Sequence, residues 1–149
     1  MIERTFVMIK PDAVLRGLIG EIISRIERKG LKIVGMKMIK LSEEEDSKLY
    51  EVHRDKPFYN DLIKFIRSAP VVVMAIEGES AISIMRKIIG PTDSKEAPPG
   101  TIRGDFSCSK SMNVIHASDS LENAKKELSI FFKENDLLNY SRLDEAFVY

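Results

Sequence analysis

Residues 70–76 read PVVVMAI, and this run decides the fold class. An almost uninterrupted series of β-branched and apolar residues is typical of a strand that is covered on both faces of a sheet. Three further segments predict strands, at residues 5–10, 31–41 and 114–115. The chain therefore contains a sheet with at least one strand in its buried middle.

Helical patterns fill the gaps between the strands, over residues 18–30, 42–68, 80–90 and 121–132. Ser42 starts a capping box with Glu45, and Pro57 divides the segment that follows into two helices that meet at a bend. Ser80 is expected to cap the next helix, which Gly90 ends. The order βα, βαα, βα, βα predicts an α/β sandwich with one sheet, and it leaves the order of the strands open.

The segment 91–112 shows no lasting periodicity, and it holds Pro98, Pro99, Gly100 and Gly104. A structureless stretch of this length is uncommon in a small domain and is usually functional or disordered. No repeat, linker or low-complexity tract divides the chain. We therefore expect a single domain over residues 1–149, with one long irregular loop.

The composition is that of a soluble globular protein: 44% of residues are hydrophobic and 31% are charged, with 23 basic and 23 acidic side chains. This balance argues against a nucleic-acid-binding surface, although it leaves a local basic patch open. No apolar run reaches membrane-spanning length, and the N-terminus lacks a signal-peptide pattern. Cys108 is the only cysteine, so no internal disulfide forms. We therefore expect a cytoplasmic protein with neither a membrane nor a nucleic acid as its partner.

The segment 113–120 reads NVIHASDS and places His116 between a short strand and the start of a helix. A neutral imidazole is a nucleophile near pH 7, and the first N–H groups of a helix attract phosphate, so the pattern indicates phosphoryl transfer. Glu127 falls on or beside the inward stripe of the last helix, where it can hydrogen-bond to His116; a surface carboxylate is an equally good interpretation. For Ser118 and Asp119, capping of that helix is the favoured interpretation.

Three cationic side chains are candidates for binding phosphate oxygens. Lys10 ends the first strand, Arg86 lies in the short helix, and Arg103 lies in the long loop. Taken singly, each is more often a solvated charge. Phe58 offers a flat face to a nucleobase, although its spacing favours a core aromatic at the start of a helix. His53 shows no metal-ligand spacing and is expected at the surface, and a structural metal site has too few ligands.

Several motifs, in order along the chain, resemble those of the nucleoside diphosphate kinase family. Residues 113–119, NVIHASD, are similar to the family's active-site signature. Residues 6–17, which contain IKPD and RG, resemble its opening, and residues 50–58 resemble its nucleotide-binding helical hairpin. Residues 99–106, PGTIRGDF, are similar to the end of its long loop. The resemblance spans nearly the whole chain, and this many ordered motifs in one short chain are highly specific.

The resemblance implies a ferredoxin-like sandwich, a four-stranded sheet with helices packed on it. It also implies an enzyme that passes the γ-phosphate of a nucleoside triphosphate, typically ATP, to a nucleoside diphosphate by a ping-pong mechanism, with His116 as the residue that becomes a phosphohistidine. Ser118 and Glu127 match residues that position the histidine; with His116 and Lys10 they make up the implied catalytic set. Phe58 matches the aromatic that stacks on the base. The matches to positions that contact the phosphates or the sugar are Lys10, Tyr50, Arg86, Thr92, Arg103 and Asn113.

Mg²⁺ is the implied cofactor. It would bridge the nucleotide phosphates and be held by them and by water, with no metal ligand expected from side chains. The length of the chain and its extension past the last helix resemble the longer members of the family, which are usually hexamers. We therefore expect a homohexamer, with a tetramer as the alternative.

Two positions depart from the family pattern. Ser94 stands where the family commonly has proline, and Tyr59 stands where a second phenylalanine is usual. A non-catalytic nucleotide-binding or regulatory domain on the same fold is the rival interpretation, because a fold alone does not determine a function. A second role in nucleic-acid binding is compatible with the sequence, but the charge balance does not support it.

Overall fold

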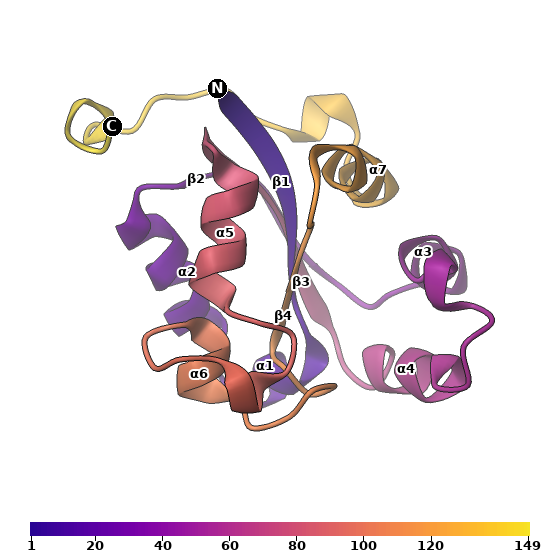
Figure 1. The fold of residues 1–149 in the computed structure, drawn as a ribbon. Coiled ribbons are helices and arrows are strands. Elements are labelled where there is room, and N and C mark those ends of the chain that lie inside the picture. Colours follow the sequence, from indigo (N-terminus) through magenta and orange to yellow (C-terminus); the bar gives the residue numbers. More distant parts are fainter.

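The computed structural model describes residues 1–149 and shows one antiparallel sheet of four strands in the order β2-β3-β1-β4 (Figure 1). The strands are β1 (Ile2–Ile9), β2 (Lys32–Ile39), β3 (Val71–Glu79) and β4 (Ile115–Ala117). Strands β1 and β3 are central, and β2 and β4 form the edges. The four predicted strands are present, and their order, which the sequence pattern left open, is that of a ferredoxin-like sandwich.

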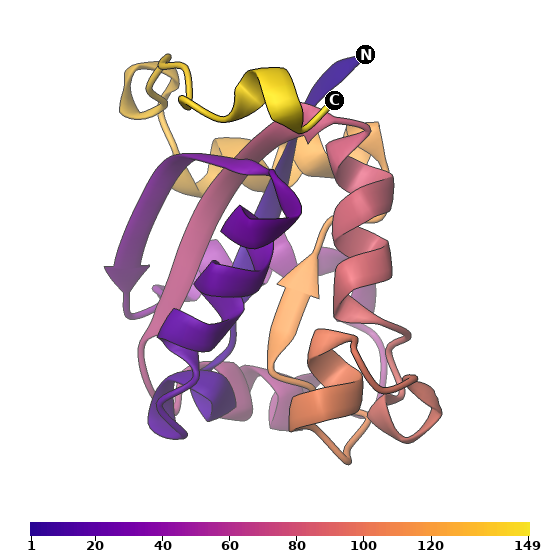
Figure 2. The same cartoon turned by 90° about the vertical axis from the view of Figure 1, so that its left-hand side faces the viewer.

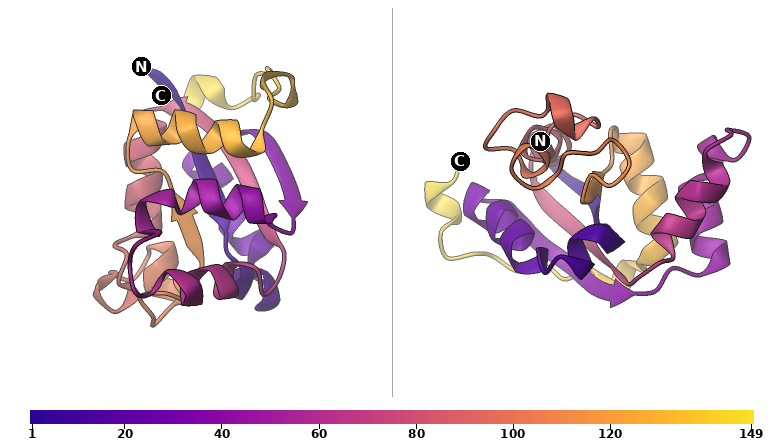
Figure 3. Two further views of the ribbon diagram at one scale, coloured as in Figure 1. Left: turned by 90° about the vertical axis from the view of Figure 1, so that its right-hand side faces the viewer. Right: turned by 90° about the horizontal axis from the view of Figure 1, so that it is seen from below.

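Helices cover both faces of this sheet, with α2 and α5 on one face and α3 and α7 on the other (Figures 1 and 3). The α-helices are α1 (Pro11–Leu15), α2 (Ile19–Lys29), α3 (Glu43–Leu49), α4 (Tyr59–Ile66), α5 (Ala81–Ile89), α6 (Ile102–Phe106) and α7 (Leu121–Phe131). The 3₁₀ turns are η1 (Glu51–His53), η2 (Ser94–Glu96), η3 (Glu134–Asp136) and η4 (Glu145–Phe147). None of the helices combines the length and the apolar character needed to span a bilayer.

The strands place alternate side chains in two cores, one on each face of the sheet. In β1, Val7 and Ile9 join the core beneath α2 and α5, whereas Phe6 and Met8 join the core beneath α3 and α7. Strand β3 divides its apolar residues in the same way, and all of those in residues 71–76 are buried. Each large side chain removed from water in this way contributes about 1.5–3 kcal/mol. The uninterrupted apolar run of β3 is thus explained by burial on both faces.

Of the two helix caps predicted at Ser42 and Ser80, one is confirmed and the other is wrong. The capping box at α3 is confirmed: the Glu45 N–H donates to Ser42 Oγ at 3.1 Å, and the Ser42 N–H donates to Glu45 Oε1 at 3.0 Å. The expected Ser80 cap on α5 is wrong, because Ser80 has φ of 55° and its side chain accepts no hydrogen bond from that helix. Its backbone N–H instead donates to the Met1 carbonyl, which joins the start of α5 to the start of β1.

The long loop is more ordered than expected. Residues 91–112 contain η2 and the one-and-a-half-turn helix α6, so the expectation of an irregular stretch is wrong in part. Thr101 caps α6 by accepting a hydrogen bond from the Gly104 N–H at 2.9 Å. A helix of 5 residues is too short to show a period in the sequence, which is why the pattern missed it.

The segment after α7 runs back across the ends of α2 and β2 (Figure 2). The Leu138 N–H donates to the Val34 carbonyl at 2.9 Å. Arg142 Nη1 donates to the carbonyls of Glu27 and Leu31 at 3.1 and 3.0 Å, and so satisfies acceptors at the C-terminal end of α2. This C-terminal segment therefore lies at the opposite end of the sheet from Lys10 and residues 113–115.

Candidate active site

The candidate site lies where the end of β1 meets the start of β4. His116 pairs with Met8 in the antiparallel register of these two strands. The Lys10 N–H, just past the end of β1, donates to the Val114 carbonyl at 2.9 Å. The sheet therefore brings together Lys10 and His116, which are far apart in the sequence.

The imidazole of His116 contacts a carboxylate, and a hydroxyl holds that carboxylate in turn. Its Nε2 lies 2.8 Å from Glu127 Oε1, and Ser118 Oγ donates to the same oxygen at 2.7 Å. An ionised carboxylate only accepts hydrogen bonds, so Nε2 carries the proton and Nδ1 keeps its lone pair; this tautomer is assigned from the hydrogen bond. The predicted contact between Glu127 and His116 is therefore present, and it leaves the lone pair of Nδ1 without a partner in this pair.

The capping interpretation of Ser118 is wrong. Ser118 is fully buried, and its hydroxyl donates to Glu127. The cap of α7 is Ser120, which accepts from the Asn123 N–H at 3.1 Å, while Asp119 accepts from Asn123 Nδ2 at 2.6 Å. Two serines in the same short segment compete for the cap position, and the helix starts at the later one.

A strained turn precedes the histidine. The Ile115 N–H donates to the Asn113 carbonyl at 2.8 Å across Val114, whose φ is 65°. This is a γ-turn with positive φ, a conformation that is rare and costs about 1–3 kcal/mol for a β-branched residue. The Val114 N–H donates to Asp12 Oδ2 at 3.1 Å, so a carboxylate at the start of α1 holds the turn in place.

Arg103, which lies on α6 in the long loop, hydrogen-bonds to the same turn. The guanidinium is buried and donates to three backbone carbonyls, those of Asn113, Gly90 and Ile115, at 3.3, 2.9 and 2.7 Å. Burial and the nearby charge of Arg86 lower the pKa of Arg103 to about 10. Of its five N–H groups two remain for a ligand. Arg103 therefore shapes the site as well as adding positive charge to it.

The Asp12 carboxylate offers a test of how firmly the turn is held. Replacing Asp12 with alanine leaves the buried Val114 N–H without an acceptor, and we expect the free energy of unfolding to fall by about 1–3 kcal/mol. Asp12→Asn retains an acceptor oxygen and is expected to lose less than half of that. Urea unfolding of the two variants beside the wild type measures both values. Equal losses in the two variants would contradict the assigned hydrogen bond.

Lys10 belongs to a polar network that ties β1 to the loop. Its Nζ donates to Asn113 Oδ1 at 2.7 Å, and Asn113 Nδ2 donates in turn to the Thr92 and Lys110 carbonyls at 2.9 and 3.1 Å. Burial and the charge of Arg103 lower the pKa of Lys10 to about 8, with Asp12 opposing the shift. Arg86 on α5 donates to the Ala117 carbonyl at 3.2 Å. The cations predicted from the sequence thus converge around the segment that carries His116.

A row of aromatic rings lies on the segment that joins α3 to α4. The centroids of Tyr50 and His53 are 6.5 Å apart, and those of His53 and Phe58 are 5.5 Å apart. Phe58 is 48% exposed, so its interpretation as a core aromatic is wrong and its ring is available to a ligand. Burial, with smaller contributions from the charges of Glu127 and Asp46, raises the pKa of Tyr50, whose phenol oxygen is buried without a hydrogen-bond partner.

The expectation that His53 lies at the surface is wrong. The residue is half-buried, its Nδ1 is buried with no hydrogen-bond partner, and its ring packs between those of Tyr50 and Phe58. Desolvation and the charge of Lys56 lower its pKa. The sequence signal for this position is spacing. His53 comes three residues after Tyr50, in a short segment that ends in Pro57 and Phe58, and the three rings lie together in the structure.

The two departures from the family pattern have different structural consequences. Ser94 is buried, and its N–H donates to the Ser109 carbonyl at 3.3 Å, a hydrogen bond that proline cannot make. Tyr59 is the first residue of α4 and packs against the core beneath α3 and α7.

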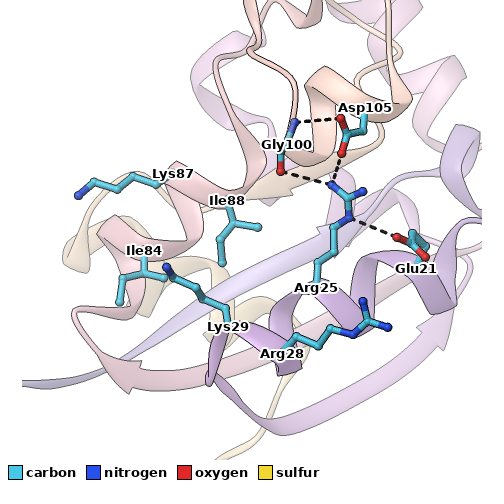
Figure 4. A pocket seen from close by; sticks show the side chains of 9 residues that line it. All are labelled: Glu21, Arg25, Arg28, Lys29, Ile84, Lys87, Ile88, Gly100 and Asp105. Atoms are coloured by element: carbon cyan, nitrogen blue, oxygen red, sulfur yellow. Dashed lines mark hydrogen bonds and ion pairs between the residues drawn. The ribbon is translucent and has the colours of Figure 1, made fainter. Parts of the chain in front are cut away.

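A separate hollow lies between α2, α5 and the start of α6 (Figure 4). There Arg25 pairs with Asp105 at 2.6 Å and with Glu21 at 3.4 Å. None of the site residues predicted from the sequence lines this hollow. No cluster of three or more His, Cys, Asp or Glu side chains in the molecule is arranged to hold a metal ion.

This chain is similar in sequence to known proteins over nearly its full length. Residues 3–137 match the family model described as nucleoside diphosphate kinase. The chain is 63% identical over 137 residues to a nucleoside diphosphate kinase of Sulfurisphaera tokodaii, which covers 92% of this chain and 93% of the relative. It is 60% identical over 135 residues to one from Saccharolobus solfataricus, which covers 91% and 98%.

Solved structures share the fold. A halophilic nucleoside diphosphate kinase from Halobacterium salinarum in complex with CDP has a TM-score of 0.96 and 45% identity, covering 100% of this chain and 99% of that one. A transition-state mimic of the enzyme from Borrelia burgdorferi, with bound vanadate and ADP, has a TM-score of 0.92 and 42% identity, covering 98% and 96%. On the family match and on these identities, this chain belongs to the nucleoside diphosphate kinase family.

Proposed function

We propose that this enzyme transfers the γ-phosphate of a nucleoside triphosphate, typically ATP, to a nucleoside diphosphate through a phosphohistidine on His116. One observation carries the proposal: Glu127 fixes Nε2 as the protonated nitrogen and leaves the Nδ1 lone pair free, while three cationic side chains hydrogen-bond to residues 113–117 around His116. Phosphoryl transfer needs alignment and charge neutralisation more than covalent help from the protein. A rigid imidazole supplies the first and the cations supply the second.

The transfer proceeds in two half-reactions. In the first, the Nδ1 lone pair forms a bond to the γ-phosphorus while the bond from that phosphorus to the β–γ bridging oxygen breaks, and the nucleoside diphosphate leaves with that electron pair. In the second, a terminal β-phosphate oxygen of another diphosphate attacks the phosphohistidine, and the P–N bond breaks. Throughout, the Nε2 proton stays on the ring, where Glu127 balances the positive charge that phosphorylation creates.

The remaining site residues are assigned to the substrate. Lys10, Tyr50, Arg86, Thr92, Arg103 and Asn113 are proposed to contact the phosphates or the sugar, and Phe58 to stack on the base. Stacking tolerates every base, so we expect low selectivity among nucleotides. The relatives with CDP and with ADP and vanadate, both similar to this chain over nearly its full length, support a nucleotide site of this kind.

Mg²⁺ is proposed to enter with the nucleotide, as part of the substrate. Glu127, the carboxylate beside His116, is already engaged by His116 and Ser118, and the side chains assigned to the phosphates include Lys10, Arg103 and Asn113, which suit phosphate oxygens better than a divalent cation. The nucleotide phosphates and water would therefore be its main ligands. When bound, the ion neutralises charge on the β- and γ-phosphates.

Initial rates at varied donor and acceptor concentrations test the function directly. If a phosphoenzyme forms before the acceptor binds, plots of the reciprocal initial rate against the reciprocal ATP concentration are parallel at several fixed concentrations of GDP. Intersecting lines would mean direct transfer between two bound nucleotides and would overturn the proposal. Nucleotide binding with no transfer would favour a regulatory domain on the same fold.

The pH dependence of the reaction is expected to report Lys10. Its pKa of about 8 means that the ammonium loses its proton as the pH rises through that value, and with it one positive charge for the phosphates. We therefore expect kcat/KM for ATP to fall to about half of its pH 7 value near pH 8 and to decline by up to about tenfold per unit above that. Lys10→Gln is expected to be slow at every pH and to lack this alkaline decline. A wild-type profile that stays flat to pH 9.5 would contradict the assignment.

We also propose a homohexamer. The edge strand β2 exposes Met36 and Met38, and the C-terminal segment exposes Leu143 and Phe147. Contacts with further copies of the chain would cover these apolar side chains and the open edge. Sedimentation equilibrium is expected to give about six times the chain mass of 16.9 kDa. A mass of four chains would support a tetramer instead.

We propose that residues 1–149 form a single domain and that the protein acts in the cytoplasm. Both cores use the same sheet, so neither half of the chain can bury its apolar side chains without the other. Cys108 is an exposed free thiol, and such a thiol persists in a reducing compartment.

A further inference from the structure

An ion pair joins the two helices of the α3–α4 hairpin, residues 43–66. The proposed phosphoryl transfer does not use this pair. Asp46 on α3 is fully buried. Arg67, the residue after α4, donates to both of its carboxylate oxygens: Nη2 to Oδ1 at 2.9 Å, and Nε to Oδ2. Such a planar, two-point contact fixes direction as well as distance.

The ion pair lies at the C-terminal end of α4, and the exposed ring of Phe58 lies at the N-terminal end of the same helix. Helix α4 begins at Tyr59, and Phe58 precedes Arg67 by nine positions, or about 13 Å along a helix. A tilt of about 10° at Arg67 therefore moves Phe58 by about 2 Å. On the α3 side, the Tyr50 N–H donates to the Asp46 carbonyl at 3.0 Å, so the pair also lies one helical turn from the first aromatic of the row.

The other ion pairs of the hairpin are solvated. Lys48 and Glu44 are 57% and 78% exposed, and Lys126 and Glu51 are 50% and 57% exposed. Pairs of this kind contribute little, because water screens them. Only the Asp46–Arg67 pair joins α3 to α4 through a buried carboxylate. The Arg67 side chain is 39% exposed, so water screens this pair in part, and its geometry is more informative than its contribution to stability.

We propose that Asp46 and Arg67 are positioning residues for the base end of the nucleotide. By fixing the tilt of α4 against α3, the pair holds the ring of Phe58 at stacking distance from the nucleobase. The inference rests on the proposed function, since it presupposes that Phe58 stacks on the base of the phosphoryl donor. It predicts that breaking the pair weakens recognition of the base and leaves the chemistry at His116 intact.

Two phosphoryl donors separate these effects: ATP, which carries a base, and phosphoramidate, which carries neither base nor sugar. With either donor, Nδ1 of His116 gains the phosphoryl group, and the leaving group is ADP or ammonia. The rate of phosphoenzyme formation is measured against donor concentration in Arg67→Met and Asp46→Asn. Glu44→Gln, on the exposed face of α3, is the matched control. Asp46→Leu/Arg67→Met removes the pair without leaving an unpaired buried charge, and thermal unfolding confirms that each variant is folded.

In the variants that break the pair, we expect the half-saturating ATP concentration to rise about tenfold, with a maximal rate within about twofold of wild type and an unchanged rate with phosphoramidate. Glu44→Gln is expected to match the wild type with both donors. An unchanged ATP dependence in the folded double variant would overturn the inference, as would a parallel loss with both donors. A wild-type protein that neither donor phosphorylates would instead overturn the proposed function.

Discussion

Replacing His116 with alanine is expected to lower the rate of phosphoryl transfer from ATP to GDP by at least about 10⁴-fold, to the level of the uncatalysed background. The reason is that, in the proposed mechanism, the imidazole is the group that receives the phosphoryl in the first half-reaction. The surrounding cations are untouched by this change, so ADP is expected to bind within a few-fold of the wild-type affinity. Coupled-assay rates and calorimetric titration measure the two quantities.

Loss of activity and of ADP binding together would point to a damaged site and would not test the role of His116. Activity in the folded His116→Ala variant above about 1% of wild type would contradict the account, because it would require another nucleophile or direct transfer.

Replacing Glu127 with alanine is expected to lower kcat by about 10²–10³-fold with a small change in KM. Without the carboxylate, the His116 ring is free to adopt the other tautomer or to rotate, and the charge of the phosphohistidine is no longer balanced. The same change leaves the buried Ser118 hydroxyl without its acceptor. Steady-state kinetics with ATP and GDP measure the split between kcat and KM.

Glu122 provides the matched control, since it is an exposed carboxylate on the same helix with no assigned partner. Glu122→Ala is expected to retain kcat within about twofold of wild type. If Glu127→Ala raised KM and left kcat unchanged, the residue would belong to substrate binding and the assigned tautomer would lose its support.

The main features of the fold were readable because burial leaves a local trace. The run at residues 71–76 is apolar at every position, and the structure buries alternate side chains in different cores. The contact between His116 and Glu127 was also predictable, since a strand end and the inward stripe of the next helix meet by geometry. Short elements such as α6 left no trace, because they end before a period can be counted.

Other parts of the site depend on contacts across the fold. Nothing near Asp46 in the sequence distinguishes it from the three glutamates before it, and only its contact with Arg67 explains its burial. The buried role of Ser118 was hidden by its neighbour Ser120, which is an equally good cap by type. The exposure of Phe58 likewise follows from where the hairpin stands beside the sheet and not from the residues around it.

The central claim is that the phosphoryl group rests on His116 between donor and acceptor. Incubation with γ-labelled ATP and Mg²⁺ tests it, with His116→Ala and His53→Ala in parallel, because these are the only 2 histidines of the chain. We expect an acid-labile, base-stable label on the wild type and on His53→Ala, and none on His116→Ala. GDP is expected to discharge this label as GTP. No label on the wild type, or a label that survives in His116→Ala, would contradict the claim.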